Sequence, residues 1–495
     1  MRLEAPLVLA ALLCAAAVAC SGASRGATDS PVRADSPVVQ APSGPPPTAA
    51  TATAPGAAPA VAANTAQLAE PPAVAAAPGA PSPVPPTAAA TEPTAPTPEQ
   101  ARVAQVLHYD DKDPLADLEQ ADELDRSAGK IHTVDVTPPA RGCAVQSEPR
   151  RLWSAPGIAS VAAIGGGFVI AGYAQADHAE RLFILHLPVS GLAEPIATLR
   201  VEPPHPTPRV APPGLAAELS QGATLAYTDG AGVLFMQHVQ VGSAHGGAAR
   251  TELAKGVDTR FAPAVAYGKR GPLIAYTLGT TPMRTRLLRL GARGELLTTH
   301  DVTPTAMGAA APAFVAGAVP PVLVTADARN GMSPIARIPL AEDGQPAPGQ
   351  ATIPVGMMST PAQLTAAQAS FGAFVGYTGL GSAATSAVGL LQLTPKPGAP
   401  SALVKGTAYG PLHVAAVASR NALVFAADAP LGPGKAPAHE IQLTRIDAQG
   451  PGPVLHIPGP GGDATCVSLA RGDDGRIAVV FTGKDGVYLA TVRCE

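Results

Sequence analysis

The sequence is poor in charged and aromatic side chains, and both shortages exclude classes of protein. Asp, Glu, Lys and Arg make up 14% of the 495 residues, and the formal net charge is −4. This composition offers no basic surface to neutralise the phosphates of a nucleic acid, so we expect no nucleic acid partner. Trp153 is the single tryptophan, which excludes repeats that carry one tryptophan in every unit.

Motifs of familiar chemistry are also missing. The eleven histidines lack the close spacing of a zinc site, and no HExxH, CxxC or GxSxG motif occurs. The glycine-rich loop that cradles nucleotide phosphates is absent as well. The sequence therefore predicts no metal, no cofactor and no catalytic residue.

The N-terminus has the pattern of an export signal. An apolar run from Leu7 to Ala19 follows Arg2, is too short to span a bilayer, and ends in the small residues of a secretory cleavage site. Cys20 comes next, preceded by Ala17 where Leu is usual. This arrangement resembles the lipobox of bacterial lipoproteins. The resemblance implies a signal peptide over residues 1–19, a lipid on the Cys20 sulfur, and, because Ser21 rather than Asp follows, an outer-membrane location on an undetermined side.

Two linkers follow the predicted anchor. Residues 20–98 consist almost entirely of Ala, Pro, Thr, Ser and Gly, and lack the large apolar side chains that could offset the entropy lost on ordering. We expect a disordered tether, which would reach about 250 Å if fully extended as polyproline II and about 50 Å as a flexible coil. Residues 99–140 are acidic and are predicted to be a partly helical linker.

A sequence pattern that recurs seven times extends over residues 141–495. Each copy has an apolar run, a Gly-containing turn, and a second apolar run centred on an aromatic or small residue. The central residues follow one another at 54, 49, 49, 52, 48 and 56 residues, and this period indicates an array of similar supersecondary units. They are Tyr173, Tyr227, Tyr276, Thr325, Tyr377, Phe425 and Phe481.

Each unit can be divided into four strands, A to D. In the third unit we expect strands over 262–266, 272–277, 284–290 and 295–302, and the third of these alternates Arg or Thr with Leu, as a half-buried strand does. Four strands in about fifty residues are typical of a blade of a β-propeller. The sequence thus predicts an all-β fold, a seven-bladed β-propeller with four-stranded blades.

The ends of the domain predict how the ring closes. The last unit stops after its third strand, near Val492, whereas residues 148–153 form an extra strand before the first unit. Pairing of these two segments would complete the last blade and remove two open edges. It would also bring Cys143 and Cys494 to one rim and leave Cys466 at the opposite rim. Among the three pairings that are open, we therefore predict a Cys143–Cys494 disulfide, with Cys466 as a free, buried thiol that lacks any motif to supply a base.

A binding face is expected on the loops. The predicted A strands near the axis are small and apolar and carry no convergent carboxylates, so a site must come from the connections between strand D of one unit and strand A of the next. The polar residues of these connections are our candidate binding residues. They are His205, Arg209, Asp258, Arg260, Tyr409, His413 and Asp463.

The whole chain is similar in type to bacterial outer-membrane lipoproteins with a β-propeller domain, although its repeat lacks the diagnostic residues of any one family. The resemblance implies a membrane-anchored, extracytoplasmic binding or scaffolding protein whose partner is an envelope protein or a glycan. The alternative is a surface or periplasmic enzyme that acts on a polysaccharide or peptide through the loop face. The sequence makes no prediction of oligomeric state.

Overall fold

The computed structural model describes residues 136–495, apart from 177–178, 190–192, 219–221, 243–249, 305–307, 328–331, 359–362, 381–385, 406–412, 420 and 432–438. This part of the chain consists of β-strands and their connections, with a short 3₁₀ helix, η2 (Pro460–Gly462). No helix in these described ranges is long and apolar enough to cross a membrane. The predicted signal peptide with Cys20, the tether, and the acidic linker up to residue 135 lie outside them.

Four sheets are meanders, in which four antiparallel strands pair in the order of the sequence, as predicted for the repeat. The first contains β2 (Gly157–Ile164), β3 (Gly167–Ala176), β4 (Ala179–Pro188) and β5 (Glu194–Arg200). The second and third contain β6 (Gly214–Ala217), β7 (Gly222–Thr228), β8 (Leu234–Gln240), β9 (Thr251–Ala254), β10 (Ala264–Gly268), β11 (Gly271–Leu278), β12 (Arg284–Leu290) and β13 (Leu296–Asp301). The fourth contains β22 (Val414–Ala418), β23 (Leu423–Pro430), β24 (His439–Asp447) and β25 (Gly450–Pro458).

A sheet of eight strands combines two further four-stranded antiparallel runs. Their strands are β14 (Ala310–Ala316), β15 (Val322–Ala326), β16 (Met332–Pro339), β17 (Ala351–Met358), β18 (Leu364–Ala369), β19 (Gly372–Leu380), β20 (Ser386–Thr394) and β21 (Ser401–Lys405). The runs join where β14 pairs in parallel with β18, with Ala316 opposite Ala367, and where β17 pairs with β19. The repeat did not predict this junction.

The last sheet is built from both ends of the domain. It contains β26 (Ala464–Arg471), β27 (Ile477–Gly483), β28 (Gly486–Cys494) and, as its outer strand, β1 (Cys143–Trp153). In the β1–β28 register Arg150 lies opposite Leu489 and Cys143 opposite Cys494. The predicted closure of the ring is therefore confirmed, and β1 begins five residues earlier than the predicted strand.

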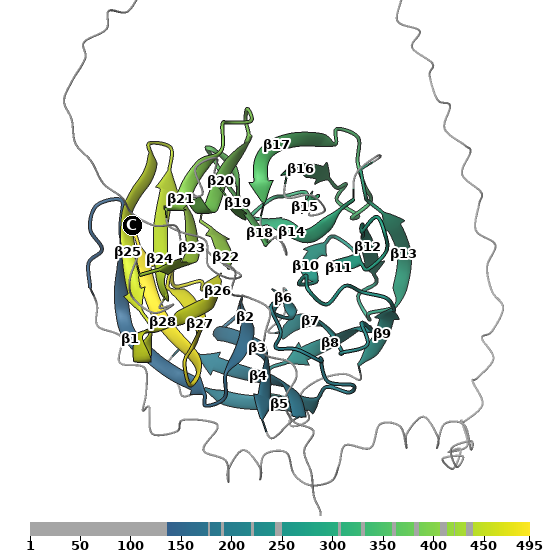
Figure 1. Ribbon diagram of the computed structural model, residues 1–495, viewed down its shortest axis with the longest axis horizontal. Helices are drawn as coiled ribbons and strands as arrows, with labels where there is room; N and C mark the ends of the chain where they lie inside the picture. The colour runs from purple at the N-terminus through teal and green to yellow at the C-terminus, as the bar shows by residue number, and fades with distance from the viewer. Residues whose placement is uncertain are drawn as a thin grey trace, which may run out of the picture. The chain divides into compact units, whose positions relative to one another are not determined.

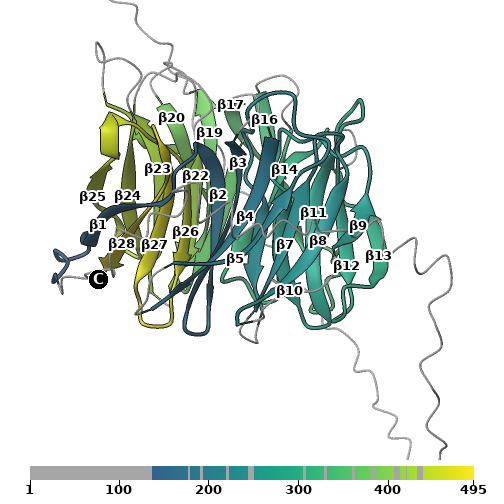
Figure 2. The ribbon, with the colours of Figure 1, turned by 90° about the horizontal axis from the view of Figure 1, so that it is seen from below.

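The sheets are arranged around a centre (Figure 1), and Figure 2 shows the ring from the side, with strands running between its two faces. The inner strands contact one another in the cyclic order β2, β6, β10, β14, β18, β22, β26 and back to β2. This arrangement is a β-propeller. We call the rim where the inner strands begin the entry face, and the opposite rim, with the turns between β2 and β3 and their equivalents, the hairpin face.

Packing between neighbouring sheets forms the core. All seven residues of β7 are buried, including Thr224 and Thr228, because each sheet is covered on both faces. Trp153 of β1 stacks on Phe183 of β4 with 4.6 Å between ring centroids, which packs the closing sheet against the first meander. The continuous second apolar runs of the repeat thus correspond to strands that are buried on both faces.

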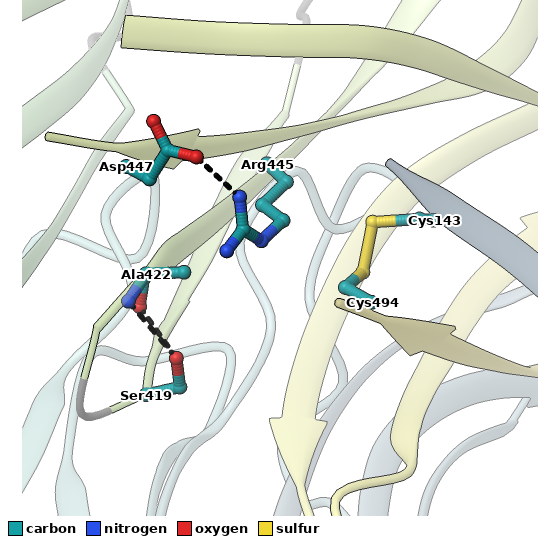
Figure 3. The surroundings of a disulfide bond; sticks show 6 residues. All are labelled: Cys143, Ser419, Ala422, Arg445, Asp447 and Cys494. Atoms are coloured by element: carbon teal, nitrogen blue, oxygen red, sulfur yellow. Dashed lines mark hydrogen bonds and ion pairs between the residues drawn. A yellow bond between two sulfur atoms is a disulfide. The ribbon is translucent and has the colours of Figure 1, made fainter. Parts of the chain in front are cut away.

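The predicted disulfide is present. Cys143 and Cys494 are bonded on the hairpin face, and their Cα atoms lie 4.1 Å apart (Figure 3). Cys466 is the free cysteine in the described chain and lies near the start of β26, at the entry face, but it is only partly buried rather than fully buried as predicted. In β26 its backbone takes a positive φ of 56°, where the register to β27 shifts by a bulge.

Candidate functional site

The entry face carries the candidate binding residues. His205 and Arg209 lie in the β5–β6 connection, and Asp258 and Arg260 lie between β9 and β10. His413 comes directly before β22, and Asp463 directly before β26. Tyr409 lies outside the described residues.

A buried ion pair anchors the β5–β6 connection. Arg209 Nε donates to Glu180 Oε1 at 2.6 Å and Arg209 Nη2 donates to Glu180 Oε2 at 3.0 Å, and the two side chains are 3% and 0% exposed. The guanidinium also donates to Thr228, to Oγ1 at 2.9 Å and to the carbonyl oxygen at 2.8 Å. Such bidentate geometry fixes the position of a connection that has no secondary structure of its own.

The ring of Tyr173, the central residue of the first repeat, packs against this ion pair. Its ring lies under Arg209, with the guanidinium carbon 4.2 Å from the ring centroid. Its hydroxyl donates to the Thr228 carbonyl at 3.2 Å and accepts from the Thr228 amide at 2.9 Å. Burial raises the pKa of Tyr173, although the charge of Arg209 acts in the opposite direction. Arg209 is thus buried and fully engaged, and it presents no charge on the surface.

Two further contacts of His205 hold the β5–β6 connection, one to the β9–β10 connection and one back to Glu180 of β4. His205 Nε2 lies 2.8 Å from Thr259 Oγ1, and the His205 amide donates to Glu180 Oε2 at 3.0 Å. Beside Thr259, Arg260 forms a bidentate pair with Asp258, at 2.9 and 2.6 Å. The hydrogen bond to Asp258 raises the pKa of Arg260, whose side chain is 52% exposed. Arg260 is therefore a partly exposed positive charge on this part of the entry face, held in place by Asp258.

His413 connects the β5–β6 connection to the other side of the ring. Its Nε2 lies 3.0 Å from the carbonyl oxygen of Val210. The inner strands that follow these residues, β6 and β22, are separated by β2 and β26 in the ring. The connection therefore reaches across the axial region to contact His413.

Asp428 of β23 holds His413 and the start of β26. Its Oδ1 accepts from the His413 amide at 2.6 Å, and its Oδ2 lies 3.2 Å from His413 Nδ1. The same Oδ2 accepts from the Cys466 amide at 3.0 Å. Asp428 is fully buried and His413 is 6% exposed. One carboxylate thus joins an imidazole and a cysteine that come from neighbouring sheets.

Elsewhere in the ring, threonine side chains accept the kind of backbone hydrogen bonds that Asp428 accepts here. Thr378 Oγ1 accepts from the amide of Gln363, directly before β18, and Thr277 Oγ1 accepts from the amide of Ala311, which has a positive φ of 53° in the bulge of β14. Asp428 combines both contacts in one side chain. A carboxylate at a position where a neutral hydroxyl suffices requires a positive partner, since an unpaired buried charge is costly.

The imidazole of His413 supplies that partner. Each ring nitrogen faces an oxygen, the Val210 carbonyl and the Asp428 carboxylate, and a carbonyl or ionised carboxylate oxygen can only accept. Both contacts are hydrogen bonds when each ring nitrogen carries a proton. Burial lowers the pKa of His413, but interactions with the side chains of Cys466 and Asp428 raise it more, and the result lies well above the ordinary value. This rise in pKa favours the protonated form of the buried His413 ring.

Asp463 belongs to a separate pair. Its Oδ1 accepts from the His439 amide and lies near His439 Nδ1, both at 3.0 Å. Of the candidates that the structure describes, His205 and Arg209 are joined through Glu180, Asp258 and Arg260 form their own adjacent pair, and His413 is reached through Val210. Asp463 is linked to β24 instead.

Sequence reasoning missed Glu180 and Asp428. Glu180 precedes one apolar run and Asp428 follows another, and no motif surrounds either residue. Cys466 was judged to lack a base, because His413 and Asp428 are 53 and 38 residues away in the sequence. An acidic residue ends the second apolar run of the sixth repeat, but Asp229 and Asp327 follow the corresponding runs of the second and fourth repeats, so this position does not distinguish Asp428.

The described side chains form no metal site. No group of three or more His, Cys, Asp or Glu side chains in the described ranges is arranged to hold a metal ion. The His413, Asp428 and Cys466 cluster is joined partly through backbone amides, which cannot ligate a cation.

Comparisons with known proteins assign this chain to no family. No protein-family model matches the sequence, and no curated protein matches it. Among solved structures, the lectin BP39L from Burkholderia pseudomallei aligns with a TM-score of 0.48 at 14% identity, over 69% of this chain and 96% of its own. Puromycin hydrolase aligns with a TM-score of 0.45 at 15% identity, over 69% of this chain and 54% of its own. A protein of unknown function from Dyadobacter fermentans gives 0.41 at 11% identity, over 71% of this chain and 99% of its own. Likenesses this distant carry no argument about function.

Proposed function

We propose that the chain is an outer-membrane lipoprotein that binds or scaffolds a partner through the entry face of a seven-bladed β-propeller. In this proposal Cys20 carries the lipid, residues 20–98 form a disordered tether, and the partner is an envelope protein or a glycan. The anchor and the location rest on the lipobox-like sequence alone.

The count of seven blades rests on dividing the eight-stranded sheet. Each of its halves is a complete four-stranded antiparallel run with its own inner strand, β14 or β18. Two such blades and the five separate four-stranded sheets make seven, which matches the seven repeats.

The observation that carries the binding role is the pre-organisation of the entry face. The β5–β6 connection is held at three places, by Arg209 to Glu180, by His205 to Thr259, and by Val210 to His413. A connection fixed in this way loses little entropy when a partner docks on it. Arg260, exposed beside it, supplies a charge for recognition.

The same contacts disfavour the enzyme alternative. An acid and base pair needs carboxylates or imidazoles that can exchange protons with a substrate. Glu180, Asp258, Asp428 and Asp463 are each engaged with an Arg or His, and both ring nitrogens of His413 face acceptors. The charged groups of the described entry face stabilise its shape.

A photo-crosslinking experiment tests the binding face. A photoreactive amino acid would replace Arg260 on the entry face or, as a matched control, Lys269 on the hairpin face. Both residues belong to exposed ion pairs, Arg260 with Asp258 and Lys269 with Glu342. Irradiation of the full-length, lipidated protein in its own envelope should give discrete adducts from position 260 and none from 269. Equal adducts from both positions, or none from 260, would refute the proposed face.

A further inference from the structure

The β5–β6 connection is held on both sides of a short stretch that reaches across the axial region. On one side Arg209 is fixed by Glu180, and on the other the Pro213 carbonyl accepts from Ser160 Oγ at 2.7 Å. Residues 210–212 lie between these two contacts. The stretch runs into consecutive prolines, which have no N–H to donate, so its hydrogen bonds have to be made largely through its carbonyl oxygens.

His413 contacts one of these carbonyl oxygens from the other side of the ring. Its Nε2 lies 3.0 Å from the Val210 oxygen, and its Nδ1 lies 3.2 Å from Asp428 Oδ2. The side chains of His413 and Asp428 are 7% and 0% exposed, so water cannot readily replace either contact. Both oxygens are acceptors, and the imidazole therefore satisfies both only when it carries two protons.

We propose that His413 is a pH-dependent switch of the entry face: the doubly protonated ring holds residues 210–212 across the axial region, and loss of one proton at higher pH releases them. The release of these residues is a property of the fold alone. Its role as a regulator of binding rests on the proposed function, because the released stretch belongs to the face that is proposed to bind a partner.

Loss of one proton breaks the contact with Val210 rather than the contact with Asp428. A hydrogen bond to a carboxylate is roughly twice as strong as one between neutral groups, so the remaining proton stays on Nδ1. The lone pair of Nε2 then faces the Val210 carbonyl oxygen, and two buried acceptors without a donor disfavour this position of the connection. Asp428 still accepts from the amides of His413 and Cys466, at 2.6 and 3.0 Å, so β22 and β26 stay in place.

The charged and titratable groups around His413 set the pH range of the switch. Asp428 faces the ring from β23, and Cys466 lies beside it on β26. On the connection, Arg209 is paired with Glu180, and the inner strands β18 and β22 carry no charged residue. Burial lowers the pKa of His413, but interactions with Cys466 and Asp428 raise it more, to well above its ordinary value. The connection is therefore held at neutral pH and released in the alkaline range.

The carbonyl chemical shift of Val210 tests the switch, because this shift changes when the oxygen loses a hydrogen bond. Full-length protein labelled with ¹³C-carbonyl valine and ¹⁵N-alanine gives correlated signals from Val–Ala pairs alone, and a Val210→Ile variant identifies the signal of Val210. The ¹⁵N shifts of the His413 ring are followed in the same titration, from about pH 6 to about pH 10. We expect two protonated ring nitrogens near pH 6, and a change at Val210 with the same midpoint as the loss of the ring proton.

Three variants separate the switch from a general effect of alkali. Asp428→Asn keeps an oxygen that can accept from the His413 amide but removes the charge, and should lower the midpoint by about 1–3 pH units. His413→Gln should abolish the pH-dependent change at Val210. The matched control is His456→Gln, which removes a His–carboxylate pair with Glu440 on the outer strands of the same sheet and should leave the midpoint unchanged.

The unaltered protein by itself can overturn the proposal. A Val210 signal that stays constant while the ring loses its proton, a ring that is already neutral near pH 6, or a ring that keeps both protons until the protein unfolds would each do so. The same change at Val210 in a folded His413→Gln variant would also overturn it. These measurements involve no partner, whereas adducts from position 260 report on binding alone, so failure of the switch and failure of the proposed binding face are distinguishable.

Discussion

Cys143 and Cys494, 351 residues apart in the sequence, are bonded across the β1–β28 pair that closes the ring. The bond covalently joins two strands of the last sheet that the chain itself does not connect. Closure therefore depends on strand pairing, on the disulfide, and on contacts made by the residues just before β1.

Replacing both cysteines should destabilise the closing sheet first. In the chain-entropy account, a loop of this length gives the disulfide upwards of about 4 kcal/mol. We expect Cys143→Ser with Cys494→Ser to lower the melting temperature by about 5–10 °C. Hydrogen exchange should accelerate in β1 and β28 before it changes in β10 to β13. Uniform acceleration across all sheets, with no earlier loss at β1, would contradict this role.

The ion pair between Arg141 and Asp447 should stabilise the closed ring, and this stabilisation should be lost at low pH. Arg141 donates to both carboxylate oxygens of Asp447, at 2.9 and 2.8 Å, and holds the pKa of that carboxyl far below its usual value. A carboxylate whose pKa is lowered on folding stabilises the protein above its unfolded pKa of about 3.9, and this contribution is lost as the pH falls through the folded value. The melting temperature of Arg141→Ala should thus lie below that of the unaltered protein at pH 7.

Thermal unfolding between pH 7 and pH 2.5 measures this gap in melting temperature between the unaltered protein and Arg141→Ala. It should shrink as the pH falls below about 4. Lys269→Ala, which breaks an exposed pair on the hairpin face, is the control and should change little at any pH. A gap for Arg141→Ala that stays constant into acid would mean that Arg141 acts through packing rather than through Asp447.

The buried pair Glu180 and Arg209 should show strong coupling. Glu180→Gln leaves the Arg209 charge buried with no ionised partner, and we expect a loss of about 3–5 kcal/mol in the free energy of unfolding. Glu180→Leu combined with Arg209→Met should cost less than the sum of the single changes, because no buried charge remains. Urea unfolding of the double-mutant cycle checks this prediction. Additive single effects would mean that the ion pair contributes no interaction of its own.

The fold could be predicted because each repeat shows its strands through sequence patterns that lie within a short stretch of the chain. The spacing from Tyr227 to Tyr276 gives the size of a unit, and the alternation in β12 gives a strand whose observed bounds match the predicted ones. The extra strand before Trp153 and the missing one after Val492 indicated the closure. Each of these signals lies within a single unit or at a chain end.

The site could not be predicted in the same way, because it is made by contacts between units. Arg209 was predicted to be a binding residue on a loop, yet it is buried against Glu180, which reaches it from β4. Asp428 and Cys466 meet because β22 and β26 are neighbours in the ring. One sequence gives no measure of which polar residues of different repeats converge, and the parallel pairing of β14 with β18 was hidden for the same reason.

Alkaline pH should weaken the stabilisation that His413 provides. Burial acts to lower the pKa of His413, but Cys466 and Asp428 raise it well above the ordinary value. A group whose pKa is raised on folding contributes fully below its unfolded pKa of about 6.5, and this contribution is lost as the pH rises through the folded value. The difference in unfolding free energy between the unaltered protein and His413→Gln should therefore be largest near pH 6 and decline toward pH 9. Urea unfolding measures it, and a difference independent of pH would argue for a neutral His413.

The lipid anchor is tested by removing one of two neighbouring cysteines. Cys20 follows the small residues that end the apolar run, whereas Cys14 lies within the run. If Cys20 is lipidated, Cys20→Ala should move the protein from the membrane pellet to the soluble fraction, because the acyl groups that bind the membrane are then missing. Cys14→Ala keeps Cys20 and should still sediment with outer membrane after a high-salt wash. Retention of Cys20→Ala in the washed membrane would show that something other than a lipid on this residue anchors the protein.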